Sequence, residues 1–139
     1  MSTYTRVNKE RNLVVEVPLF MNHINIYGIR GKSFAKSIRI GEKVESVKKL
    51  FNEGATGMQL VFYDARAYDD FFGVVYKDKY DLKALPVIYF FNWDGDPLCS
   101  VKMDRNINFF DIDFVHEKLL VFDSTTESLF ACDFRLPNN

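Results

Sequence analysis

Hydrophobic and polar residues alternate along most of this chain, in short runs separated by polar or glycine-containing turns. Alternation with a period of two is typical of a β-strand that buries one face. The runs that predict strands are Leu13–Phe20, Ile24–Ile29, Phe34–Ile40, Gln59–Ala67, Phe71–Lys77, Pro86–Trp93, Leu98–Asp104, Ile107–Phe114, Leu119–Asp123 and Leu129–Phe134. Asp94-Gly95 and Arg30-Gly31 each follow such a run and are typical of tight hairpin turns. The pattern therefore predicts an all-β chain of antiparallel strands.

The hydrophobic period changes between Gly41 and Gly57. The apolar residues that recur there with helical spacing are Val44, Val47, Leu50 and Phe51. Acidic side chains come early in this segment and basic side chains late, which suits the dipole of a helix. We therefore predict one short helix near residues 43–53, inserted between the strands.

The strand pattern also repeats within the chain. A shift of 47 residues places Phe62–Ala65 on Phe109–Ile112, and a shift of 64 places Ile24–Tyr27 on Ile88–Phe91. A period of about 40 to 50 residues with four strands per unit is typical of β-propeller blades. We therefore expect a single domain, a partial propeller of about 2.5–3 four-stranded antiparallel blades. Its parts would be blade one (about 1–41), the helical insertion (about 42–57), blade two (about 58–105) and an incomplete blade three (about 106–136).

A hairpin motif follows the run that begins at Pro86. Its distinctive residues are Asn92, Trp93, Asp94, Gly95, Pro97, Asp104 and Arg105. This motif resembles the blade motif of the TolB-like six-bladed β-propeller proteins of Bacteroides-type bacteria. The segments 117–134 and 38–43 are similar to that family's closing hairpin and to its insertion. The resemblance runs from about Leu13 to Leu136 and covers only the C-terminal part of the family's chain, about three blades.

This resemblance implies a propeller fold and an exported protein of the cell envelope, often lipid-anchored, with no established activity. It implies no catalytic residues. The polar start Met1–Arg6 is not followed by the apolar segment of a signal peptide, so the chain as given departs from the family in this respect.

About three blades cannot close into a ring, and open strand edges tend to pair with other chains. The chain would be a piece of a larger protein, one of two half-rings that together form about six blades, or a compact assembly that covers its open faces differently. We expect a homo-oligomer formed through the open blade edges.

Several acidic residues are candidates for chemistry. Asp111 and Asp113 share one face of a predicted strand, near His116 and Glu117, as a metal or acid–base site would require, but a solvated strand face followed by a polar turn fits them better. The segment 104–108 starts like a calcium loop, yet Phe109 and Val115 stand where that loop needs glycine and glutamate, so turn caps are expected. We predict no catalytic, cofactor-binding or metal-binding residues.

Other residues have two interpretations each. Trp93 is either a stacking platform for a sugar or peptide or, as we expect, an apolar residue packed within or between blades. His23 and His116 are either zinc ligands or, as we expect, hydrogen-bonded turn residues. Cys99 and Cys132 either form a disulfide or, as we expect, are a pair of buried free thiols. The segment 77–83 mixes charges of both signs and predicts a solvated loop.

Composition and charge exclude some classes of function. The 139 residues have a formal net charge of −1, which argues against nucleic-acid binding, and the longest apolar run, Leu85–Phe91, is far too short to span a membrane. The aromatic fraction of 16% favours β-structure. We expect a non-enzymatic module for recognition of a protein or glycan, or for scaffolding. The alternative is a glycan-active hydrolase or lyase that uses carboxylates, such as Asp64 and Asp111, in a propeller channel.

Overall fold

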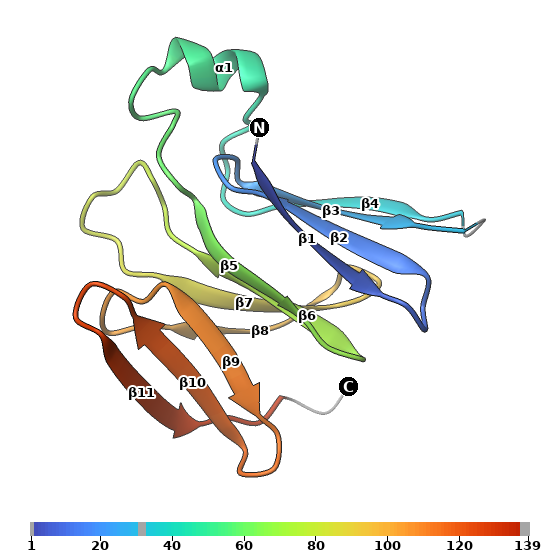
Figure 1. Cartoon of the computed structure of the whole chain (residues 1–139). Helices are drawn as coiled ribbons and strands as arrows, with labels where there is room; N and C mark the ends of the chain where they lie inside the picture. The colour runs from blue at the N-terminus through green and yellow to red at the C-terminus, as the bar shows by residue number, and fades with distance from the viewer. Residues whose placement is uncertain (1, 31–32, 137–139) are drawn as a thin grey trace.

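The computed structural model describes residues 2–30 and 33–136, and this part of the chain has the predicted all-β fold class (Figure 1). Its strands form three antiparallel sheets, each in chain order. The first sheet contains β1 (Thr3–Asn8), β2 (Leu13–Pro18), β3 (His23–Gly28) and β4 (Ala35–Arg39). The second sheet contains β5 (Phe62–Ala67), β6 (Phe71–Tyr76), β7 (Val87–Asn92) and β8 (Pro97–Lys102). The third sheet contains β9 (Phe109–Asp113), β10 (Lys118–Asp123) and β11 (Ser128–Asp133).

Equivalent strands recur at the shifts that the sequence predicted. β5 and β9 begin 47 residues apart, and so do β6 and β10. β3 and β7 begin 64 residues apart, because α1 (Val47–Asn52) and its flanking loops lie between the first two sheets. The three sheets are therefore repeats of one strand pattern, as in propeller-like blades.

The second sheet lies between the other two, and each of its faces carries a hydrophobic core (Figure 1). One core joins it to the first sheet and contains Val15, Ile26, Phe72 and Trp93. The other core joins it to the third sheet and contains Ile88, Phe90, Phe110 and Leu119, among others. The first strands of the sheets touch in order, β1 against β5 and β5 against β9, so they form the inner edge of the stack.

The hairpin between β7 and β8 has the predicted tight turn. Gly95 adopts a φ of 86°, a left-handed conformation that glycine reaches without steric cost. The side-chain oxygen of Asn92 accepts hydrogen bonds from the backbone N–H groups of Asp94 (3.0 Å) and Asp96 (2.9 Å). In the other predicted turn Arg30 has a φ of 53°, whereas Gly31 lies outside the described residues.

Two elements differ from the prediction. β1 was not predicted, because its inward side chains are the polar Tyr4, Arg6 and Asn8 rather than aliphatic residues. The helix is shorter than 43–53 and begins after Ser46, whose hydroxyl accepts the N–H of Lys49 at 3.2 Å. Only Leu50 of its helical apolar set is buried, and Val44, Val47 and Phe51 are exposed.

Two further expectations were wrong about burial. Cys99 and Cys132 are free, but Cys99 is only half-buried and Cys132 is exposed, because β11 is the outermost strand of its sheet. In the segment 77–83, Lys79 is buried instead of solvated, because it forms an internal ion pair. In the described part of the chain, no helix has the length and hydrophobicity that crossing a membrane would require.

Candidate functional site

The carboxylates of Asp64 and Asp111 lie on the neighbouring inner strands β5 and β9 and meet around Arg66. The Arg66 guanidinium is 3.4 Å from Asp64 and 3.7 Å from Asp111. Asp64 is buried, and its two oxygens accept the backbone N–H groups of Ala65 (2.9 Å) and Phe110 (3.2 Å). Its hydrogen bonds therefore tie the second sheet to the third.

Asp111 repeats part of this arrangement one sheet further on. Its Oδ1 accepts the N–H of Ile112 at 2.8 Å, as Asp64 does with Ala65. The same oxygen accepts the Tyr68 hydroxyl at 3.0 Å, and burial together with this bond raises the pKa of Tyr68 above its usual range. Both carboxylates thus hold N–H groups, a hydroxyl or a guanidinium, which is a structural role.

The remaining acidic candidates cap turns. Asp113 accepts the N–H groups of Val115 and His116, both at 3.1 Å, and lies 2.7 Å from the His116 ring nitrogen. These bonds, the ring contact first, lower the pKa of Asp113. Asn108 accepts the N–H of Ser124 at 2.7 Å, and Asp104 pairs with Arg105. Within residues 2–30 and 33–136, no three His, Cys, Asp or Glu side chains are grouped to hold a metal ion.

Trp93 lies inside the molecule. Its side chain packs between the first and second sheets, beside the ring of Phe72, and its residue is 2% exposed. The indole N–H donates to the backbone carbonyl of Tyr68 at 3.0 Å. This geometry supports the packing interpretation and leaves no ring face available for stacking on a ligand.

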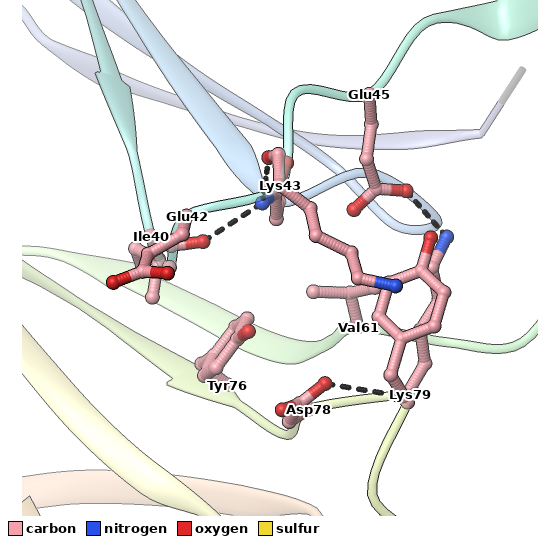
Figure 2. A pocket seen from close by; sticks show the side chains of 11 residues that line it. Ile40, Glu42, Lys43, Glu45, Val61, Tyr76, Asp78 and Lys79 are labelled. Atoms are coloured by element: carbon pink, nitrogen blue, oxygen red, sulfur yellow. Dashed lines mark hydrogen bonds and ion pairs between the residues drawn. The ribbon is translucent and has the colours of Figure 1, made fainter. Parts of the chain in front are cut away.

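A polar cavity lies where the inserted segment meets the first two sheets. Its lining includes the ion pair between Lys79 and Glu45, whose nitrogen and oxygen are 2.5 Å apart and whose side chains are each 1% exposed. Figure 2 shows these two side chains pointing toward each other, with Tyr76 and Asp78 also on the wall. The Lys79 ammonium also donates to the carbonyls of Phe20 (3.0 Å) and Gly57 (3.4 Å). One side chain therefore fastens three separate segments of the chain.

The size and chemistry of this cavity fit a structural role. Its volume is about 90 Å³, space for a few water molecules and far below the several hundred cubic ångströms of a typical ligand pocket. Asn22 lines it, and the Asn22 side-chain oxygen has no hydrogen-bond partner among the described residues. Burial raises the pKa of Tyr76 to about 12.

The outer face of the third sheet, which points away from the second sheet, is apolar apart from Asp111 and from one end, where Asp113, Lys118 and Asp133 form a charged row. We define it by the side chains that alternate with the inward-facing Phe110, Leu119 and Val121, namely Phe109, Asp111, Leu120, Phe122, Leu129 and Ala131. Leu129 is 66% exposed and Phe109 is 43% exposed. The rings of Phe109 and Phe122 stack with their centres 6.4 Å apart.

The strand register matches this outer face to a covered face of the second sheet. Val75 pairs with Ile88 and Gly73 with Phe90 in the second sheet. Phe122 pairs with Leu129 and Leu120 with Ala131 at the equivalent places in the third. In the second sheet these positions lie under the third sheet, with Val75, Ile88 and Phe90 completely buried. The outer face of the third sheet therefore has the composition of a sheet-packing surface.

Sequence reasoning did not find the Lys79–Glu45 pair or the outer face. The first had no signal, because the two charges are far apart in sequence and each lies in a polar segment. The second had one: the shift of 47 residues places Val75 on Phe122 and Gly73 on Leu120. The third sheet has apolar residues at the positions equivalent to a packed face of the second sheet. This pattern would have predicted a further packing surface.

No protein-family model matches this chain, and no curated protein does.

Proposed function

We propose that this chain is a non-enzymatic recognition or scaffolding module that holds another protein through the outer face of its third sheet. The observation that carries the proposal is the equivalence of this face to the covered face of the second sheet. An exposed apolar sheet face is a typical protein-binding surface, and sheets pack face to face with their apolar side chains interdigitated. An aliphatic and aromatic surface of this kind favours a protein partner over a glycan.

Asp111 supports the same interpretation. One sheet earlier, the equivalent Asp64 uses its second oxygen to accept the N–H of Phe110 on the next inner strand. The second oxygen of Asp111 faces Arg66 at 3.7 Å, and the side chain is 53% exposed. An inner strand of a partner sheet would find in Asp111 the acceptor that β9 finds in Asp64.

The test compares the proteins retained by three versions of the purified chain. Phe109→Lys places a charge on the outer face, and the control Leu82→Lys places one on a loop residue that is already 85% exposed. We expect the wild type and L82K to retain the same partner proteins, and we expect F109K to lose them. If F109K retains the same proteins as the wild type, the outer face is not the recognition surface.

We also propose that the partners include a second copy of the chain, bound through open blade edges, and that the chain is related to the TolB-like propellers. Three repeated sheets support both ideas, because the outer strand of each has one edge that pairs with no other strand of the described residues. The glycan hydrolase alternative has no comparable support, because Asp64 and Asp111 are engaged in structural hydrogen bonds.

A further inference from the structure

The outermost strands of the three sheets, β4, β8 and β11, differ in how well they resist pairing with another chain. A strand edge is protected by Lys or Arg side chains, by Pro or by an irregular register. β4 carries Lys36 and Arg39. β8 begins with Pro97, ends with Lys102 and has a register shift beside Phe91.

β11 has none of these protections. Its sequence is Ser-Leu-Phe-Ala-Cys-Asp, and it pairs with β10 over six residues without a register shift. The last described residues turn away from its open side, because the N–H of Phe134 bonds to the carbonyl of Glu117 and the Phe134 ring packs on Phe90. β11 is therefore a regular edge without Lys, Arg or Pro, and its one charged residue, Asp133, pairs with Lys118 of β10.

The Phe134–Glu117 bond also fixes which backbone groups of β11 point outward. In an antiparallel pair, residues that bond to the neighbouring strand alternate with residues that do not. Because Phe134 bonds inward at 2.9 Å, the residues two and four positions earlier, Cys132 and Phe130, also bond to β10. The N–H and C=O groups of Leu129, Ala131 and Asp133 therefore face the open side.

We propose that two copies of this chain pair through β11, antiparallel, about a two-fold axis at Ala131. In this register Ala131 faces the partner's Ala131, and Leu129 faces the partner's Asp133. Every outward-facing N–H and C=O group of the strand then finds a partner, and side chains of the two copies stay on matching faces.

A groove beside this edge adds side-chain burial to the backbone pairing. It has a volume of about 380 Å³ and an apolar wall that includes Val101, Met103, Phe130 and Cys132. Lys102, Asp104 and Arg105 form its charged part, and the Arg105 guanidinium lies 4.0 Å from the centre of the Phe130 ring. In the proposed register the partner's Phe130 lies opposite Cys132 and enters this groove. The inference deepens the proposed self-association and does not depend on the role of the outer face.

Light scattering across a concentration series tests the pairing. We expect a wild-type mass near twice 16.2 kDa, and self-association weakened at least about tenfold in Ala131→Pro. Proline removes the outward N–H and leaves the bonds between β11 and β10 in place. Ala131→Val keeps the N–H and is expected to remain a dimer, and circular dichroism checks the fold of each variant.

A cross-linking experiment covers the case in which A131P fails to fold. In a background with both Cys99 and Cys132 replaced by serine, Ala131→Cys is expected to oxidise to a covalent dimer, because the facing Cα atoms would lie about 5.5 Å apart. Leu120→Cys, on the central strand, is the control in the same background and is expected to form no covalent dimer. A wild-type monomer at about 1 mM overturns the inference. A dimer that F109K abolishes and A131P does not overturns it as well, and places self-association on the outer face.

Discussion

Replacing Lys79 with methionine tests whether the buried ion pair fastens the inserted segment. Methionine keeps an unbranched side chain of similar length and removes the ammonium group. That group contacts Glu45 at 2.5 Å and donates to the carbonyls of Phe20 and Gly57. The variant therefore leaves the Glu45 carboxylate, with 1% of its side chain exposed, without its counter-charge.

The expected cost is large in comparison with the stability of a small domain. Removing one member of a buried ion pair costs about 3–5 kcal/mol, because the remaining charge stays in a medium of low polarity. A domain of this size has a total unfolding free energy of about 5–15 kcal/mol. The double variant K79M/E45L removes both charges and is expected to lie within about 1–2 kcal/mol of the wild type, or above it. The coupling energy of the pair is then about 3 kcal/mol or more.

Urea unfolding followed by tryptophan fluorescence is the assay, because Trp93 is the only tryptophan of the chain and is buried. Lys118→Met is the matched control: it breaks the Lys118–Asp133 pair, whose side chains are 42% and 90% exposed. This surface pair is expected to contribute less than about 1 kcal/mol. The reasoning is refuted if K79M loses no more stability than K118M, or if the double variant loses the sum of the two single losses.

Three further predictions concern other parts of the molecule. All seven tyrosines have raised pKa values, each mainly through burial. Their hydroxyls therefore stay protonated to a higher pH in the folded state than in the unfolded state. Their contribution to stability is complete below about pH 10 and is lost as pH rises through the folded values, so tyrosinate absorbance should rise together with unfolding instead of at the ordinary pKa. Gly73→Ala should destabilise by about 1–3 kcal/mol in the same urea assay, since its Cβ would lie 2.7 Å from the Phe90 ring and 2.9 Å from that of Phe110; an unchanged midpoint would contradict the packing. In protein dilute enough for the proposed pairs to dissociate, a thiol reagent at neutral pH should modify one exposed cysteine quickly, and Cys132→Ser should abolish this fast phase, because burial raises the pKa of Cys99; a fast phase that persists would contradict the assignment.

The strands and their repeat could be predicted because local periodicity carries that information. β3 alternates buried Ile24 and Ile26 with half-buried or exposed neighbours, and the hairpin after Asn92 has its own turn chemistry. β1 could not be predicted, because side-chain hydrogen bonds to the second sheet hold it in place. Tyr4 donates to the carbonyl of Tyr63, and Arg6 to that of Ala65. Polar side chains at alternate positions indicate a packed strand only once their hydrogen-bond acceptors are known.

The buried ion pair shows a second limit of sequence reasoning. Burial of a charge depends on whether segments far apart in sequence exclude water together, and no local pattern reports that. Lys79 lies among charged neighbours that are exposed or half-buried, and the insertion that carries Glu45 closes over it only in the folded chain. The turn carboxylates were easier, since Asp113 binds N–H groups two and three residues away.

The two ends of the stack differ, and this difference decides which face is the better binding surface. Second-sheet residues that pack on the first sheet form the pairs Phe72–Phe91 and Val74–Tyr89. The equivalent pairs on the outer face of the first sheet are Val14–Tyr27 and Glu16–Asn25, so one of the two pairs has become polar.

On the outer face of the third sheet both equivalent pairs stay apolar, as Phe122–Leu129 and Leu120–Ala131. A ring of two half-rings would have to place this apolar face against the polar Glu16–Asn25 pair, and would desolvate those groups without known partners. Pairing through the β11 edge leaves both outer faces uncovered and avoids that cost. The asymmetry therefore favours an edge-paired dimer whose third-sheet faces remain available to another protein over a closed ring of two copies.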